Sequence, residues 1–135
     1  MPSYHHVTDD TGMVFFIEPL MLLRFKEIDD DHFKLFKLID DLNNKSLSAT
    51  DKDAIFTKLI EYATKHFSLE EALFLESNYD SEHHKSEHLK ILTILKQFNS
   101  TKTKMSDLLK FLTAWLNHHI LVEDKKFVDF YRTKV

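Results

Sequence analysis

Apolar residues recur along the chain at the three- and four-residue spacing of amphipathic α-helices, in four separate segments. We predict helices over residues 28–42, from Thr50 or Asp51 to Ser77, from Ser81 or Glu82 to Phe98, and from Met105 to about Phe127. Polar runs at residues 43–46, 78–80 and 99–104 separate these segments. Amphipathic helices joined by short polar turns favour an all-α fold, an up-down-up-down four-helix bundle, and no segment predicts a strand.

The apolar positions that repeat at this spacing are expected to form the core of the bundle. In chain order they are Ile28, Leu35, Phe36, Ile39 and Leu42, then Phe56, Leu59, Ile60, Ala63, Phe67, Leu73 and Phe74, then Ile91, Leu92, Leu95 and Phe98, and finally Met105, Leu108, Leu109, Leu112, Trp115, Leu116, Ile120 and Phe127.

Residues 1–27 lack this periodicity, and we interpret them as an N-terminal arm laid over a bundle formed by residues 28–135. The most apolar run of the arm, residues 13–23, is interrupted by Glu18 and Pro19. It is shorter than the roughly 20 apolar residues that a membrane-spanning helix needs. Asp9 and Asp10 precede it, where a signal peptide carries positive charge. We therefore expect no membrane span.

Composition narrows the class of protein further. A chain of 135 residues is long enough for one domain with a hydrophobic core, and its single Gly and two Pro favour helices. The net charge of −4 gives no basic surface for nucleic acid. The absence of Cys excludes disulfides, thiolate metal sites and cysteine nucleophiles. Such a chain suits a reducing cytosol, and we expect a cytoplasmic location.

Nine histidines stand out against this background, and each predicted apolar stripe is interrupted by at least one of them. The interrupting residues are His32, His66, His84, His88 and His119. A single core histidine is usually bonded to a neighbour, but five imidazoles need more hydrogen-bond partners than these stripes offer. A metal centre would satisfy all of them together.

Acidic residues accompany these histidines. Glu70 follows His66 by four residues and shares its helix face, and a buried carboxylate is costly unless it is paired or coordinated. Its neighbour Glu71 lies about 100° around the helix, where we expect solvent. Asp124 follows His119 by five residues, a net rotation of about 140° on an α-helix. Helical periodicity therefore leaves the role of Asp124 undecided.

The metal-capable residues occur in short motifs with a fixed order. The motifs are Ile28-Asp29-x-x-His32, His66-Phe67-x-x-Glu70-Glu71, His84-Lys85-x-x-His88 and Trp115-Leu116-x-x-His119-Ile120-x-x-x-Asp124. This arrangement resembles the hemerythrin family, and most closely its single-domain bacterial members, the bacteriohemerythrins. The resemblance runs from about residue 28 to 130. It departs from the family at Asp31, where a Gln is usual.

The resemblance implies a non-haem centre of two iron ions. One iron would be held by His84, His88 and His119, and the other by His32 and His66, with one position left open. Glu70 and Asp124 would bridge the two irons together with an oxo or hydroxo group. Nitrogen and oxygen ligands suit iron, although they also suit zinc and manganese.

The resemblance also implies reversible binding of dioxygen at the open iron, for storage, delivery or sensing, with a protein acceptor of the dioxygen as a further partner. The pocket lining would be Leu35, Phe67, Trp115 and Ile120. Glu123 lies near the same helix face as His119, and two readings of it stay open. It is either an acid inside the pocket or a carboxylate at the rim, solvated or bonded to a nearby Lys or His.

Other activities on the same bundle are alternatives to a carrier. They are a di-iron peroxidase or oxidase, a nitric-oxide scavenger, and a sensor module that acts through a separate partner. Ferritin-like oxidases use paired Glu-x-x-His motifs, and this sequence contains none. This absence argues against a ferritin-like oxidase but leaves peroxidase and nitric-oxide chemistry at a hemerythrin site open. The function that we expect first is a binding protein without catalytic turnover.

Overall fold

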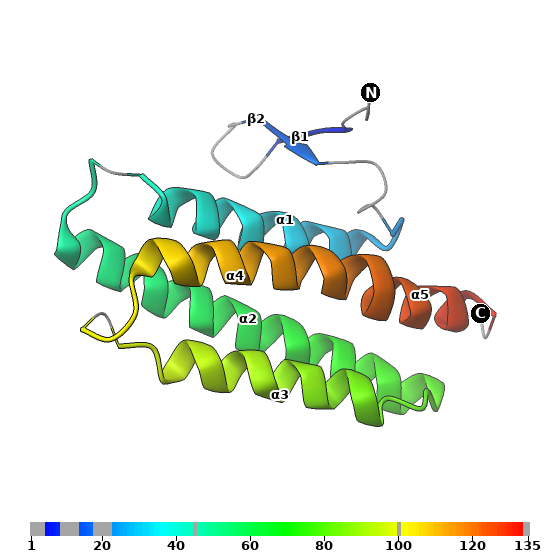
Figure 1. Ribbon diagram of the computed structural model, residues 1–135. Coiled ribbons are helices and arrows are strands. Elements are labelled where there is room, and N and C mark those ends of the chain that lie inside the picture. The colour runs from blue at the N-terminus through cyan, green and yellow to red at the C-terminus, as the bar shows by residue number, and fades with distance from the viewer. Residues whose placement is uncertain (1–4, 9–13, 18–22, 45, 100, 134–135) are drawn as a thin grey trace.

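The computed structural model describes residues 5–8, 14–17, 23–44, 46–99 and 101–133. Three helices, α1 (Lys26–Leu42), α2 (Ala49–Ser77) and α3 (Glu82–Lys96), precede a fourth helical segment. That last segment is built from α4 (Met105–His118), the π-helix η2 (His119–Asp124) and α5 (Lys125–Arg132). Each segment runs antiparallel to the one before it (Figure 1). The fold is an all-α four-helix bundle, which confirms the predicted fold class.

Local sequence explains where α2 begins and ends. The Ser48 hydroxyl caps its start by accepting a hydrogen bond from the backbone N–H of Asp51 at 3.1 Å. The cap is therefore Ser48, and the predicted caps Thr50 and Asp51 lie inside the first turn. Asn78 ends the helix in the left-handed conformation, with φ of 59°, which Asn tolerates better than most residues. The predicted break at residues 78–80 is confirmed.

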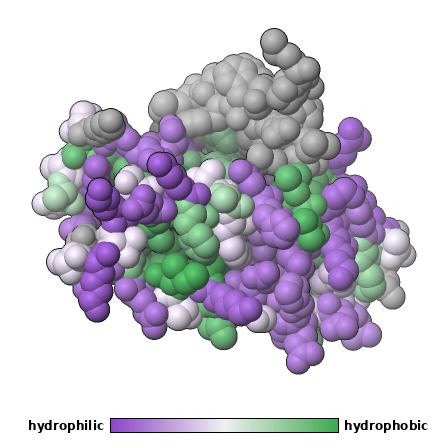
Figure 2. All heavy atoms as spheres, viewed as in Figure 1, coloured by the Kyte–Doolittle hydropathy of each residue, from purple (hydrophilic) through white to green (hydrophobic). Residues whose placement is uncertain are grey.

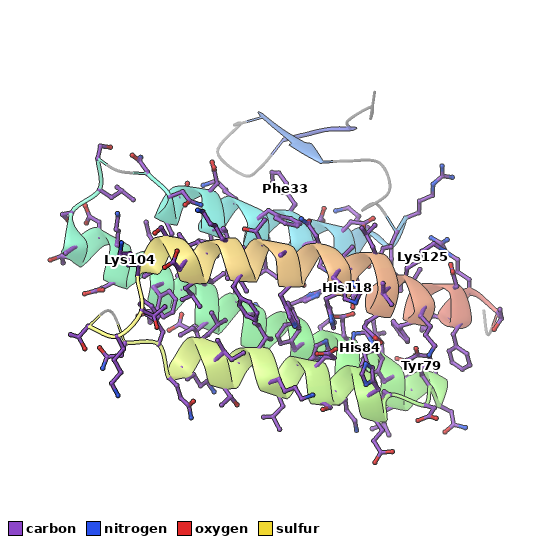
Figure 3. The ribbon with its side chains drawn as sticks, viewed as in Figure 1. Phe33, Tyr79, His84, Lys104, His118 and Lys125 are labelled. Atoms are coloured by element: carbon purple, nitrogen blue, oxygen red, sulfur yellow. The ribbon has the colours of Figure 1, made fainter. Side chains whose placement is uncertain are left out.

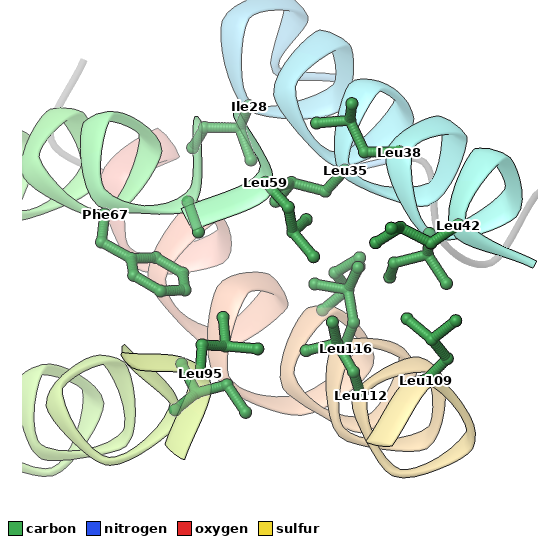
Figure 4. Close-up of a cluster of buried hydrophobic side chains, with 14 of the residues drawn as sticks. Ile28, Leu35, Leu38, Leu42, Leu59, Phe67, Leu95, Leu109, Leu112 and Leu116 are labelled. Atoms are coloured by element: carbon green, nitrogen blue, oxygen red, sulfur yellow. The ribbon is translucent and has the colours of Figure 1, made fainter. Parts of the chain in front are cut away.

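The core is formed by apolar side chains that all four helical segments turn toward one another (Figure 4). Most residues of the predicted stripes are buried, and the larger ones at the margin, such as Phe36, Phe56 and Trp115, are partly buried against them. Phe33, Leu38 and Val128 are also buried, although they lie outside the predicted stripes. Burial of this apolar surface is the main force that holds the helices together.

The fourth helical segment differs from the predicted continuous α-helix. A six-residue π-helix, η2, interrupts it between α4 and α5. The hydrogen bonds of a π-helix join residues five apart, so each turn holds more residues than an α-helical turn. Such turns are uncommon and are frequent at functional sites. This one begins at His119 and ends at Asp124, two of the predicted metal ligands.

The N-terminal arm contains a β-hairpin that the sequence pattern did not predict. Strand β1 (His5–Thr8) pairs antiparallel with β2 (Val14–Ile17), and His5 lies opposite Ile17. The hairpin lies on the α1 side of the bundle (Figure 1). The rest of the arm up to residue 22 lies outside the described residues, including much of the apolar run 13–23.

Where the described chain enters the bundle, it is tied down by polar contacts. The backbone N–H of Leu23 donates to Asp29 Oδ1 at 2.9 Å, and the Arg132 guanidinium donates to the backbone oxygens of Leu23 and Arg24. These contacts join the start of the bundle to its C-terminal end. Helix α1 begins at Lys26, slightly before the predicted boundary between residues 27 and 28.

The surface of the bundle is mostly hydrophilic in the view of Figure 2, with a group of hydrophobic side chains visible between α3 and α4. Among the helices that the structure describes, none combines the length and the apolar character that crossing a membrane requires.

Candidate metal centre

All the side chains predicted to bind metal meet inside the bundle, and they come from all four helical segments. Helix α1 contributes His32, α2 contributes His66 and Glu70, α3 contributes His84 and His88, and η2 contributes His119 and Asp124. Each of these seven residues is at most 3% exposed. His84 lies near the start of α3, on the side toward α4 (Figure 3).

One group of atoms is centred on three imidazoles. His119 Nε2 lies 3.0 Å from His84 Nε2 and 3.2 Å from His88 Nε2. Asp124 Oδ1 lies 2.9 Å from His84 Nε2 and 3.3 Å from His119 Nε2. Three ring nitrogens and a carboxylate oxygen therefore face a common point, the arrangement that one metal ion requires.

A second group lies beside the first and shares its carboxylates. His32 Nε2 is 2.9 Å from Asp124 Oδ2, and His66 Nε2 is 2.9 Å from Glu70 Oε1. Glu70 and Asp124 belong to both groups, and within each group the candidate ligand atoms lie within 4.8 Å of one another. The two oxygens of Asp124 face different groups, so this carboxylate connects them.

Despite these short distances, several of the buried atoms have no hydrogen-bond partner among the described residues. They are His32 Nε2, His66 Nε2, both carboxylate oxygens of Glu70 and both of Asp124. A buried polar atom without a partner costs about 1–3 kcal/mol. The candidate ligand atoms of each group lie within 4.8 Å of one another, and their chemistry fits a bound metal ion. The buried cluster is a candidate metal-binding site.

The π-helix explains why Asp124 joins this cluster. On an α-helix, a residue five positions after His119 would be turned about 140° away from it. In η2 the hydrogen-bonded turn spans five residues, so Asp124 returns to the face of His119. This geometry resolves the position that periodicity left undecided.

Two further carboxylates contact the Nδ1 atoms of two candidate ligand histidines. Asp31 Oδ2 lies 2.9 Å from His66 Nδ1, and Glu71 Oε2 lies 3.0 Å from His88 Nδ1. The Glu71 side chain is 38% exposed, in line with the expected solvent exposure, and its carboxylate also contacts His88 of α3. A histidine that binds metal through one nitrogen commonly donates its other N–H to a carboxylate. Both acids adjoin candidate ligands in sequence, but each contacts a histidine on another helix, which adjacency alone does not identify.

The surroundings also set the proton affinities of the ligands. Burial lowers the pKa of His66, but the neighbouring carboxylates of Asp31 and Glu70 outweigh this effect and raise the pKa to about 10. Burial and the neighbouring His84 and His119 lower the pKa of His88 to about 2. The His88 imidazole therefore stays neutral at physiological pH and keeps Nε2 free to bind a cation.

The pKa values of the two carboxylates at the centre of the cluster are shifted in opposite directions. Burial and the charge of Asp124 raise the pKa of Glu70 well above its usual range. Burial would also raise the pKa of Asp124, but contacts with His119, His32 and His84 reverse the effect and hold it well below its usual range. A cation between the two would stabilise both in the charged form.

Aromatic rings pack against the histidines and fix their planes. Phe67 is stacked on His88 with ring centroids 4.0 Å apart, and Trp115 is stacked on His119 at 4.5 Å. Phe74 lies 4.6 Å from the His84 ring. These contacts restrict the rotation of the imidazoles and replace water around them.

A small apolar cavity of about 20 Å³ adjoins this layer of rings. Its walls include Leu35, Phe67 and Trp115, three residues of the predicted dioxygen pocket. Ile120, the fourth apolar residue of that prediction, is fully buried but does not line this cavity. The space can hold one molecule of about the size of water, and all of its described lining is hydrophobic or aromatic.

Glu123 is not among the residues that line this cavity. Glu123 Oε1 lies 3.1 Å from Nε2 of His83, a histidine whose side chain is 71% exposed. Because η2 turns Asp124 into the core, the preceding residue is turned toward α3. Of the two readings of Glu123, the carboxylate bonded to a neighbouring histidine at the rim is the one observed.

Comparison with known proteins places this geometry in context. The model of the hemerythrin HHE cation-binding domain matches residues 24–131. Hemerythrin-like proteins of Naegleria gruberi and Naegleria fowleri are each 34% identical to the chain over 104 residues, which cover 75% of this chain and 80% of the relative. No solved structure gives a significant match.

The contact between Asp31 and His66 leads to a prediction about metal affinity. We expect Asp31→Asn to weaken metal binding by about 10- to 100-fold, because the charge that supports the His66 imidazole is lost. Competition with a chelator measures the change. Asp30→Asn is the matched control, since Asp30 pairs with Lys26 at the surface. Equal metal affinity in the two variants would contradict a supporting role for Asp31.

Proposed function

The chain belongs to the hemerythrin family, and from this premise we propose that it binds dioxygen reversibly at a non-haem di-iron centre. The observation that carries the proposal is a fully buried set of nitrogen and oxygen atoms, without hydrogen-bond partners among the described residues, beside an apolar cavity. The first feature suits metal ions, and the second suits a small apolar ligand.

In this proposal each group of side chains holds one iron. His84, His88 and His119 would bind the first, His32 and His66 would bind the second and leave a position open, and Glu70 and Asp124 would contact both. The approach of Asp124 Oδ1 to His84 and of Asp124 Oδ2 to His32 supports this assignment. When bound, two ferrous ions would supply the binding position for dioxygen and the electrons that it takes up.

The protein's own contribution is to orient the ligands and to exclude water. Asp31 and Glu71 hold the remote nitrogens of His66 and His88, so each imidazole presents Nε2 to the centre. Phe67 and Trp115 cover the rings on the cavity side. A dry environment protects reduced iron from water and anions.

We propose a carrier, used for storage, delivery or sensing, and not an enzyme. Within the described part of the chain, the cavity presents no titratable side chain, and Glu123 is turned away from it. Peroxidase and oxidase chemistry requires delivery of protons to the reduced oxygen, which this lining does not supply. Membership of the bacterial branch, a protein acceptor of dioxygen and a cytosolic location stay predictions.

The test of this function is optical. We expect the reduced, iron-loaded protein to develop a visible absorption band on exposure to dioxygen and to lose it under vacuum, over repeated cycles. Immediate and irreversible oxidation, with peroxide or nitric oxide consumed catalytically, would contradict the carrier and favour an enzyme on the same bundle.

The cavity supplies a second prediction. Leu35 lines the cavity, whereas Leu38, also buried on α1, does not. We expect Leu35→Ala to shorten the lifetime of the dioxygen-bound form about tenfold, because the enlarged cavity leaves the bound molecule with fewer packing contacts. Leu38→Ala is the control, since a buried Leu→Ala change costs about 2–5 kcal/mol of stability at either position. Equal lifetimes in the two variants, followed by visible absorption, would argue against the pocket.

A further inference from the structure

A second cluster of metal-binding side chains lies at the surface, outside the buried centre. It consists of His83 and Glu87 on α3 and Glu123 on η2, with candidate ligand atoms within 4.8 Å of one another. His83 Nε2 is 3.1 Å from Glu123 Oε1 and 3.6 Å from Glu87 Oε1. We call these three residues the outer cluster. Dioxygen binding at the buried centre does not explain their role.

The charges of the outer cluster favour a cation. Two carboxylates from different helical elements converge on one imidazole, and within the described chain neither forms an ion pair with a Lys or an Arg. The Glu123 side chain is only 13% exposed, so water screens its charge incompletely. A divalent ion between the carboxylates would offset their repulsion and also accept the lone pair of His83.

The ligand set indicates the kind of ion and how firmly it is held. One imidazole and two carboxylates suit a borderline transition-metal ion such as Zn²⁺ or Fe²⁺. Because the His83 side chain is 71% exposed, water would complete the coordination. A site with protein ligands on one side and water on the other binds an ion that can leave again, in contrast to the enclosed centre.

The position of the outer cluster connects it to the buried centre. His83 directly precedes His84, and Glu123 directly precedes Asp124, so two of its three residues adjoin buried members of the first group. Side chains of successive helix residues point in different directions. His83 therefore reaches the surface, whereas the neighbouring His84 and Asp124 are closed to water.

We propose that the outer cluster binds a divalent transition-metal ion and passes iron from solvent to the buried centre. The second half rests on the proposed function, because it takes the buried centre to hold iron. The transfer is an exchange of ligands without a change of oxidation state. The ion would leave the outer carboxylates and His83 and bind to His84 and Asp124, which follow His83 and Glu123 in sequence.

Binding is tested by titrating the iron-loaded protein with Zn²⁺ in a calorimeter, with the iron content measured before and after. We expect one additional Zn²⁺ per chain, with affinity at least tenfold lower in His83→Ala and unchanged in His118→Ala. His118 is the matched control, an exposed histidine at the end of α4 that lies outside the cluster. Absence of the additional Zn²⁺, or equal affinity in His83→Ala, would overturn the site.

Transfer is tested by adding Fe²⁺ anaerobically to the metal-free protein and following uptake with time. We expect His83→Ala and Glu87→Gln to load about tenfold more slowly than the wild type and His118→Ala, and to reach the same final iron content. Equal loading rates would overturn the transfer role. Neither assay uses dioxygen, so both remain readable if reversible dioxygen binding fails. Conversely, His83→Ala leaves every residue of the buried centre in place. If the outer cluster neither binds nor transfers metal, dioxygen binding at the buried centre can still be tested.

Discussion

The structure depends on the burial of polar atoms that do not satisfy one another. Five imidazoles and two carboxylates occupy the middle of a hydrophobic bundle, and several of their nitrogen and oxygen atoms have no hydrogen-bond partner among the described residues. In a protein core this arrangement is destabilising unless a cation receives the lone pairs. We therefore expect the binding of metal and the stability of the fold to be coupled in this protein.

The rest of the bundle places these groups and keeps water away from them. Each helical segment contributes at least one of them, so the centre links all four segments. The π-turn of η2 brings His119 and Asp124 to one face, and the rings of Phe67 and Trp115 cover the imidazoles. At the surface, the same π-turn directs Glu123 to His83. One local departure from α-helical geometry thus shapes both the buried centre and the outer cluster.

Sequence periodicity predicted the helices and most of the core because each helix buries one continuous apolar face. It also singled out the five buried histidines, which interrupt those faces. It could not place Asp124 or Glu123, because the α-helical wheel does not apply inside a π-turn. The role of Asp31 was hidden for another reason. Its partner His66 is on a different helix, and such contacts follow from packing, which a single sequence does not encode locally.

Smaller differences have similarly local causes. Ser48, Thr50 and Asp51 are all reasonable caps, and only the conformation of the turn before α2 selects Ser48. The β1–β2 hairpin lies in an arm without helical periodicity, where the pattern gave no strand signal. Neither difference involves the candidate metal ligands, which lie on α1, α2, α3 and η2.

We propose that the seven buried residues hold two metal ions, and the metal content of the protein tests this proposal. We expect about two irons per chain in protein prepared with ferrous iron, measured by elemental analysis against protein concentration, and a marked loss of iron in Asp124→Ala. A wild-type protein that retains no metal, or only one ion per chain, would contradict it.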